Sequence, residues 1–494
     1  MRYQNPILRG FHPDPSVCRV GADYYLVTST FEYFPALPVY HSTDLINWVL
    51  IGHCIDRPEQ LPFSLAGASG GVWAPTIRFF NGRFYVTASF NESQNFIVSS
   101  SSPASGYSNA VWVEMDGIDP SLFFEEGVLY YTANDCGSRA TEREGISLAQ
   151  LDPETGKVLG PIRRIWEGTG GGWLEASHLY HIGDWYYILT AEGGSGWGHQ
   201  VTQGRSANIW GPYKPCPYNP ILTNRNDTTK QVLETGHADY VEAPDGQPFL
   251  VHLGIRTTQG SKSNLGRETF LTPVQWQDGW MTVPGGKAVL EVETSGVARQ
   301  RMASGFTADF GSAAWEREWL FPDAATRARL RRGDGALCMP PAPASLARTA
   351  QGAVFAAVRQ PDFDCTLTAT LEVPADGGVS GGVAAYLAPG FLYRCYLDSE
   401  HQVVVEKFCE DFHQIVCRVP VPQGAVTLRI RADRNAYRFG LLQDGAWCEL
   451  GSASTRFLTT AIANRCFTGT VLGLFAEGPD GAPPLRVTRF AVTV

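Results

Sequence analysis

The sequence predicts an all-β protein in which a five-bladed β-propeller is followed by a β-sandwich. The propeller is predicted by a repeat: a turn glycine followed by an aromatic-rich strand occurs five times, at Gly21, Gly82, Gly127, Gly183 and Gly246. The spacings of 61, 45, 56 and 63 residues each suit a four-stranded sheet with its loops. Five such sheets arranged radially form a propeller, which leaves only short, protected strand edges.

The second part of the fold is predicted by a change of pattern after about residue 290. Ten of the 13 tryptophans lie in the first 280 residues. Residues 365–373 and 426–432 alternate between apolar and polar side chains, as strands of an antiparallel sandwich do. A chain of 494 residues also exceeds what one hydrophobic core usually holds. We therefore expect a propeller domain over residues 1–295 and a sandwich domain over residues 305–494.

Composition excludes several classes of function. The net charge of −10 argues against a nucleic-acid partner, which requires basic clusters. No apolar run approaches the roughly 18–20 residues that span a bilayer, and residues 1–6 do not resemble a signal peptide. The 11 cysteines contain no CxxC pair, which disfavours a disulfide framework or a zinc site. These features predict a cytoplasmic protein without membrane contact, and they leave a homo-oligomer open.

A second regularity lies seven to nine residues before each repeated glycine. These positions hold Asp14, Trp73, Asp119, Glu175 and His237. The first strand of each propeller blade lines the central axis, so equivalent positions on successive blades converge at one end of it. Three carboxylates brought together in this way repel one another, a cost that is tolerated mainly where the charge is used.

Each of these residues also has a structural interpretation when taken alone. Asp14 and Asp119 stand beside prolines, as turn residues often do. Glu175 would otherwise be an exposed glutamate, His237 a hydrogen-bonded core histidine and Trp73 a packing residue. Five coincidences at one offset are improbable, so the functional interpretation is favoured for the set.

The segments around these residues resemble a known enzyme family, family 43 of the glycoside hydrolases, and within it the two-domain β-xylosidases and α-L-arabinofuranosidases. The resemblance runs in order through the first 290 residues. It is carried by Phe-His-Pro-Asp-Pro-Ser at 11–16, Gly-Val-Trp-Ala-Pro at 71–75, Gly-Ile-Asp-Pro-Ser-Leu-Phe at 117–123, Glu-Ala-Ser-His at 175–178, Gly-His-Ala-Asp at 236–239 and Leu-Gly-Arg-Glu-Thr at 265–269.

The resemblance implies a set of catalytic roles: Asp14 as general base, Asp119 as modulator of a neighbouring pKa and Glu175 as general acid. It also implies inversion, in which the carboxylates of base and acid stand roughly 6.5–9.5 Å apart to leave room for a water molecule. One departure is visible, because the family usually has Gly-Pro after the glutamate and this chain has Ala176-Ser177.

Further residues are assigned to the pocket. Phe31 and Trp73 would offer apolar faces to a pentose ring, and Arg267 would donate paired hydrogen bonds to substrate, although a salt bridge to Glu268 or another surface acid is an alternative. The resemblance assigns His237 to the pocket and to a structural calcium or sodium ion in the channel. It predicts no cofactor for the chemistry.

The resemblance also implies that the sandwich is concanavalin-like and sends a loop over the active site. Phe467 matches the aromatic residue of that loop, and a packing role is its alternative. A pocket closed in this way accepts only chain ends, so the enzyme would be exo-acting.

The predicted activity is inverting release of terminal D-xylose from β-1,4-xylo-oligosaccharides. An α-L-arabinofuranosidase, or an enzyme with both activities on arabinoxylan fragments, is the alternative within this class, because the two terminal sugars are pentoses of similar size. A hydrolase of fructans or arabinans and a non-catalytic carbohydrate-binding propeller are less favoured, since the full motif set is present.

Overall fold

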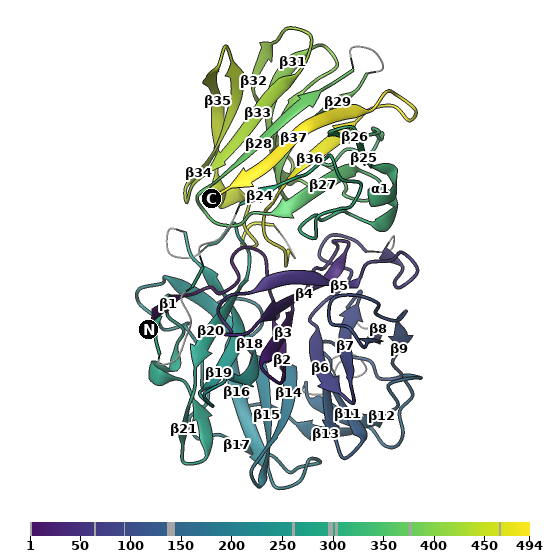
Figure 1. The fold of residues 1–494 in the computed structure, drawn as a ribbon. Helices are drawn as coiled ribbons and strands as arrows, with labels where there is room; N and C mark the ends of the chain where they lie inside the picture. Colours follow the sequence, from purple (N-terminus) through teal and green to yellow (C-terminus); the bar gives the residue numbers. More distant parts are fainter. Residues whose placement is uncertain are drawn as a thin grey trace.

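The computed structural model describes residues 2–63, 66–92, 94–135, 144–258, 262–294, 300–301, 305–374, 378–463 and 466–494. Figure 1 shows two parts stacked on each other, a propeller below and a sandwich above. Their regular structure is nearly all strand, with a short helix α1 (Ala324–Arg329) and 3-10 turns η2 (Pro284–Gly286) and η3 (Thr455–Phe457). The all-β prediction is confirmed.

The propeller contains five antiparallel sheets within the described residues. The first blade is β2 (Ser16–Val20), β3 (Asp23–Val27), β4 (Ala36–Ser42) and β5 (Val49–Ile55). The second is β6 (Thr76–Phe80), β7 (Arg83–Phe90), β8 (Gln94–Ser100) and β9 (Val111–Trp112). The third is β10 (Ser121–Glu125), β11 (Val128–Asn134), β12 (Ile146–Leu151) and β13 (Arg163–Trp166). The fourth is β14 (Glu175–Ile182), β15 (Trp185–Glu192), β16 (Gln200–Ser206) and β17 (Lys214–Pro215), and the fifth is β18 (Val232–Glu242), β19 (Pro248–Arg256) and β20 (Glu268–Pro273).

The innermost strands form a closed ring. Strands β2, β6, β10, β14 and β18 contact one another in that order, and β18 contacts β2. The five repeated glycines lie in the hairpins between the first and second strand of each blade, with φ between 61° and 83°. Glycine adopts this left-handed conformation without a steric penalty, which explains why the repeat begins with it.

The fifth blade differs from the prediction of four strands, because its sheet contains three. The N-terminal segment pairs with its outer edge instead: the N–H of Ile7 donates to the carbonyl of Thr269 at 2.9 Å, and the N–H of Thr269 donates to that of Leu8 at 3.2 Å. Strand β1 (Arg2–Gln4) also pairs with β23 (Glu291–Glu293). The two ends of the propeller are thereby joined. A hairpin of β21 (Gln275–Gln277) and β22 (Trp280–Thr282) completes this part.

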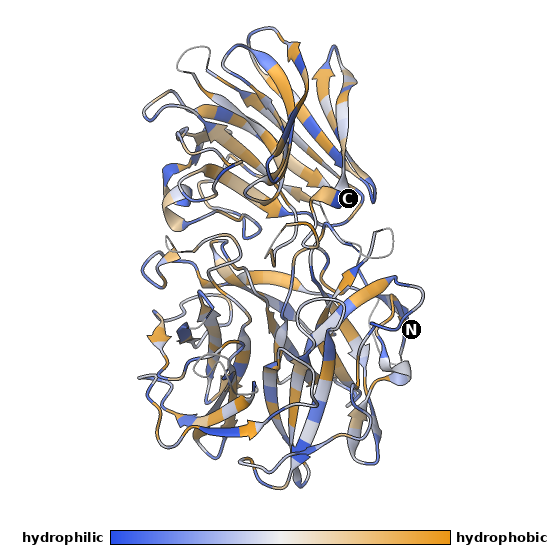
Figure 2. Ribbon diagram, turned by 180° about the vertical axis from the view of Figure 1, so that it is seen from behind, coloured by the Kyte–Doolittle hydropathy of each residue, from blue (hydrophilic) through white to orange (hydrophobic). Residues whose placement is uncertain are grey.

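The sandwich consists of two antiparallel sheets. One contains β25 (Arg331–Gly333), β26 (Ala336–Met339), β37 (Leu485–Thr493), β28 (Cys365–Glu372), β33 (Val426–Ala432), β34 (Ala436–Gln443) and β35 (Ala446–Ser454), with β24 (Phe306–Thr307) paired to β37. The other contains β27 (Val354–Arg359), β36 (Val471–Glu477), β29 (Ser380–Ala388), β30 (Phe391–Leu397), β31 (Gln402–Cys409) and β32 (Phe412–Pro420). Strand β28 alternates buried and half-buried residues along its length, as its sequence pattern predicts. Figure 2 shows hydrophobic residues along the strands and mostly hydrophilic residues in the loops.

The two parts are joined by backbone pairing and ion pairs. Phe34 of the propeller and Phe321 exchange two backbone hydrogen bonds, of 2.8 and 2.7 Å, and Asp362 forms ion pairs with Arg9 at 2.6 Å and Arg256 at 3.0 Å. Residue 295, the predicted end of the propeller domain, lies outside the described residues. Strand β24, which pairs with the sandwich, begins one residue after the predicted start at Gly305.

Candidate active site

All eight site residues predicted from the sequence line one cavity of about 380 Å³. Seven come from the propeller, and one, Phe467, comes from the sandwich. They are Asp14, Phe31, Trp73, Asp119, Glu175, His237, Arg267 and Phe467. The structure thus places the predicted residues together, whereas their individual roles remain predictions.

In four blades, a residue with positive φ lies at or directly after the polar residue that faces the cavity. Asp14, Asp119 and His237 have φ of 54°, 50° and 50°, and Ala176, which follows Glu175, has φ of 54°. The register of β14 shifts between Glu175 and His178, and that of β18 shifts around residues 236–239. Bulges of this kind redirect a side chain out of the regular strand alternation, and here they occur where the inner strands reach the cavity.

The carboxylate of Asp14 is held by two donors. Arg267 Nη1 donates to its Oδ1 at 2.8 Å, and Ser29 Oγ donates to its Oδ2 at 2.5 Å. His237 Nδ1 lies 3.8 Å from Asp14 Oδ1 and 3.7 Å from Asp119 Oδ2. Asp14 and Arg267 are both buried, so this ion pair is weakly screened by solvent.

The alternative for Arg267, a salt bridge to Glu268, is wrong. Glu268 instead receives hydrogen bonds from Arg256 Nε and Nη2, both at 2.8 Å. Adjacent residues of an extended strand point to opposite faces, which directs Glu268 away from the cavity into which Arg267 extends.

The three carboxylates differ in their electrostatic environment. Burial raises the pKa of Glu175 well above its usual value, and the charges of Asp119 and Asp14 raise it further. Burial also raises the pKa of Asp119 to about 6, with Asp14 adding to the shift and His237 and Arg267 opposing it. A cluster of this kind does not carry three negative charges near neutral pH, and Glu175 is the favoured site of a proton.

One wall of the cavity is aromatic. The ring of Phe467 lies 5.7 Å from that of Phe31, nearly parallel at 27°, and 5.5 Å from that of Trp73 at 70°. Ser69 joins the two parts of the protein at this wall, because its Oγ accepts from the N–H of Phe467 at 2.8 Å and its carbonyl accepts from Trp73 Nε1 at 3.1 Å. The sandwich loop is thus fixed over the propeller.

A second polar network involves the inner strands of several blades. Asp239 receives hydrogen bonds from Arg78 Nη1 at 2.8 Å, Tyr180 Oη at 2.6 Å and Ser16 Oγ at 2.7 Å. Burial opposes ionisation of Asp239, but Arg78, His178 and the hydrogen bond from Tyr180 together outweigh it and lower the pKa of that carboxyl. The network ties the first, second, fourth and fifth blades together in the middle of the ring.

The described residues form no ready-made set of protein ligands for the predicted channel cation. Among the described residues, no group of three or more His, Cys, Asp or Glu side chains is arranged to hold a metal ion. His237 Nδ1 faces the carboxylates of Asp14 and Asp119, and Arg267 and Ser29 already donate to that of Asp14. Calcium takes six to eight oxygen ligands, of which water can supply several, so a cation beside His237 would depend mainly on water for its coordination.

Sequence reasoning missed several residues of the cavity, of which Trp173 is the largest. Its side chain is 63% exposed, its φ is 57°, and its ring lies against Gly194, where an added Cβ would approach it to 3.0 Å. The glycine run at 170–172 was its only local signal. The other missed residues are Ala74, Glu92, Ile118, Gly194, Ser195 and His199.

Comparison with known proteins decides the family. Residues 3–281 match glycosyl hydrolases family 43, and residues 307–490 match the β-xylosidase C-terminal concanavalin A-like domain. The chain belongs to glycoside hydrolase family 43. The predicted family, the propeller with its concanavalin-like partner and the enzyme class are thereby confirmed.

Relatives of the chain carry two activities in their names. It is 36% identical, over 96% of its length and 91% of the other, to a non-reducing end α-L-arabinofuranosidase of Bacteroides ovatus. It is 34% identical to a xylosidase/arabinosidase of Humicola insolens over 97% of this chain and 95% of the other. A β-xylosidase of Bacillus subtilis is 37% identical over 60% of each chain.

Solved structures agree with this grouping. The Bacteroides ovatus protein named xyloglucan PUL GH43B superposes with a TM-score of 0.92 at 35% identity, covering 100% of this chain and 99% of the other. A xylan β-1,4-xylosidase of Bacillus halodurans gives a TM-score of 0.91 at 27% identity, over 99% of this chain and 100% of the other.

Among the described residues, no helix is long and apolar enough to cross a membrane.

Proposed function

We propose that the protein is an exo-acting, inverting glycoside hydrolase that releases terminal D-xylose from β-1,4-xylo-oligosaccharides. The observation that carries this proposal is the difference between two carboxyl groups in one cavity. Asp14 is bonded to Arg267 and Ser29, whereas burial and neighbouring charges favour the protonated form of Glu175. Hydrolysis of a glycosidic bond requires one group of each kind.

Glu175 supplies the proton. Cleavage places negative charge on the departing glycosidic oxygen, and a carboxylic acid within hydrogen-bond reach neutralises it as the bond breaks. Burial and then the charge of Asp119 raise the pKa of Glu175, and together they keep that acid protonated in the resting enzyme. This supports the modulator role for Asp119.

Asp14 acts as the base. Its carboxylate removes a proton from a water molecule that attacks the anomeric carbon from the face opposite the leaving group, so the configuration inverts. Arg267 and Ser29 orient the carboxylate with hydrogen bonds to both oxygens. No step of this mechanism passes through a metal ion.

The remaining residues position one sugar ring. Phe31, Trp73 and Phe467 form the aromatic wall against which the C–H face of a pentose packs, while Arg267 and His237 donate to its hydroxyl groups or to the carboxylates. Phe467 covers the cavity from the sandwich, which supports attack at chain ends.

An α-L-arabinofuranosidase, or an enzyme with both activities, is the second candidate. It is favoured by the name of the Bacteroides ovatus relative, which matches 96% of this chain. Terminal arabinofuranose and xylopyranose are pentoses of similar size, so one cavity of about 380 Å³ accommodates either.

The test is hydrolysis of p-nitrophenyl β-D-xylopyranoside and p-nitrophenyl α-L-arabinofuranoside side by side. Asp14→Ala and Glu175→Ala should nearly abolish the activity, and Glu154→Ala, a surface acid on a turn, is the matched control. The ratio of the two rates distinguishes the candidates, and proton NMR of the first anomer released tests inversion. A folded wild type that cleaves neither glycoside would overturn the proposal.

We further propose a cytoplasmic site of action, with imported oligosaccharides as substrates. The ten described cysteines are free thiols, which suits a reducing compartment. His237 remains our candidate ligand for a loosely held channel cation that completes its coordination with water, with a structural role only.

A further inference from the structure

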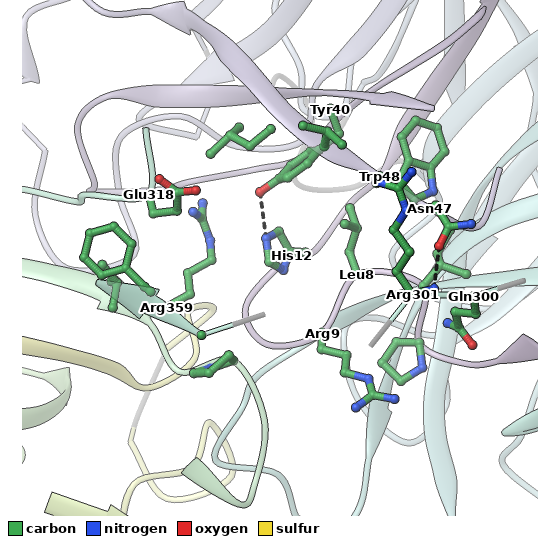
Figure 3. Close-up of a pocket in the computed structure, with 18 of the residues that line it drawn as sticks. Leu8, Arg9, His12, Tyr40, Asn47, Trp48, Gln300, Arg301, Glu318 and Arg359 are labelled. Carbon is green, nitrogen blue, oxygen red and sulfur yellow. Dashed lines mark hydrogen bonds between the residues drawn. The ribbon is translucent and has the colours of Figure 1, made fainter. Parts of the chain in front are cut away.

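A second cavity, of about 440 Å³, lies between the propeller and the sandwich. It shares no lining residue with the candidate active site. Its walls include Tyr40 and Trp48 from the first blade and Glu318 and Arg359 from the second part, as Figure 3 shows. Ligand sites occur preferentially at such boundaries between domains.

Arg359 is the central feature of this cavity. Its Nε donates to the carbonyl of Phe11 at 2.7 Å, but its Nη2 atom is buried and has no hydrogen-bond partner among the described residues. Burial is the main cause that lowers the pKa of this guanidinium, and Tyr40, Tyr33 and the charge of Glu318 offset it only in part. A buried charge of this kind is costly unless it is paired.

The other charged groups leave an excess of positive charge. Arg9 is neutralised by Asp362 at 2.6 Å, and Arg301 and Glu318 are exposed at the rim. Arg301 and Arg359 therefore face one carboxylate, that of Glu318, in the described lining of the cavity. His12 adds no charge, since burial lowers its pKa well below the usual value, and its Nε2 is 2.8 Å from Tyr40 Oη.

The cavity also has an aromatic surface and room for a ring. Trp48 is partly exposed, and Figure 3 shows it beside the cavity together with Tyr40 and Asn47. An aromatic face with hydroxyl and amide groups near it suits a sugar, which presents C–H bonds on its faces and hydroxyls at its edge. A cavity of 440 Å³ exceeds the lower limit of about 300 Å³ for small-molecule sites.

We propose that this cavity is a non-catalytic binding site for a sugar that carries a carboxylate, of monosaccharide size. The carboxylate pairs with Arg359 and receives help from Arg301, because a planar guanidinium matches a carboxylate with two parallel hydrogen bonds. The sugar ring packs on Trp48, and Tyr40 and Glu318 form hydrogen bonds with the sugar's hydroxyl groups. The inference does not rest on the proposed hydrolase activity.

The site is connected to the candidate active site through one short segment. Phe11, which accepts from Arg359, stacks on Phe31 with 6.2 Å between ring centroids. The N–H of His12 donates to the carbonyl of Arg267 at 3.0 Å. A ligand on Arg359 therefore contacts the segment that leads directly to Asp14.

The experiment is isothermal titration calorimetry of the full chain with D-glucuronate, D-glucose and acetate. We expect saturable binding of glucuronate, with glucose and acetate each at least about tenfold weaker, because a charge-assisted pair and a packed ring both contribute. Arg359→Gln should remove binding, and Arg301→Ala should weaken it several-fold. Hydrolysis of the p-nitrophenyl glycosides and circular dichroism verify that the variants fold.

The outcomes that overturn the proposal are specific. Equal affinity for glucuronate and glucose removes the role of the charge, and equal affinity for acetate reduces the cavity to a plain anion site. Competition by D-xylose, the product expected in the catalytic cavity, would place glucuronate there instead. If Arg359→Gln fails to fold, an unchanged affinity in Arg301→Ala is decisive against the site.

Discussion

Replacement of Arg267 by methionine tests the electrostatic arrangement of the candidate active site. The change removes the 2.8 Å hydrogen bond to Asp14 and keeps much of the side-chain volume between Phe31 and Phe467, whose ring centroids lie 5.7 and 5.8 Å from the guanidinium carbon. A hydrogen bond to a charged group contributes about 1.5–3 kcal/mol. At about 1.4 kcal/mol for each factor of ten, kcat/KM should fall by between about 10-fold and about 150-fold.

The same variant should change the pH dependence in a defined direction. Arg267 lowers the pKa of Glu175 and of Asp119, so its removal raises both. In the proposed mechanism Glu175 works in its protonated form, so activity should be lost as the pH rises through its pKa. The alkaline limb of the kcat/KM profile should therefore move to higher pH although the maximum is lower.

The assay is kcat/KM for the p-nitrophenyl glycoside that the wild type cleaves faster, measured across the pH range. Arg256→Met is the matched control, since Arg256 pairs with Glu268 at 2.8 Å outside the cavity. It should lower the melting temperature and leave the pH profile in place. An alkaline limb that moves to lower pH in Arg267→Met, or a kcat/KM equal to that of the wild type, would refute the reasoning.

Three further predictions follow from particular contacts. Ala176→Gly should raise the free energy of unfolding by about 1 kcal/mol, because φ of 54° is strained for alanine; a decrease in urea denaturation would contradict this. Phe467→Ala should lower kcat/KM by up to about tenfold through loss of the aromatic wall, and an unchanged value on xylobiose would disprove its role in substrate binding. Dialysis against EDTA should leave kcat unchanged, since the proposed mechanism passes no step through a metal; loss of activity that calcium restores would contradict this.

The propeller was predictable from sequence because its determinants are local and repeated. The hairpin glycines, such as Gly21 and Gly183, need positive φ, and the aromatic strands follow them directly. The same regularity predicted that Asp14, Asp119 and Glu175 would meet, since a constant offset within a blade becomes a common position around the axis.

The remaining features depend on contacts that no local pattern records. Trp173 reaches the cavity through a loop whose only signal is its glycines, and the unpartnered Nη2 of Arg359 is recognisable only after the two parts are assembled. The three-stranded fifth blade was missed for the same reason, because its edge partner is the start of the chain. The departure at Ala176 was visible in the sequence, but its left-handed backbone became known only from the structure.

Joining the propeller through its own N-terminus has a consequence for the order of assembly. Asp14 and its partner Arg267 are separated by 253 positions in the chain, and both lie beside the seam where residues 7 and 8 meet Thr269. During synthesis, Asp14, the proposed base, therefore lacks its partner until the last blade has been made and the first residues have docked on it. After dilution from denaturant, enzymatic activity should accordingly recover later than strand content measured by circular dichroism. The time course of activity would then report when the ring of blades closes.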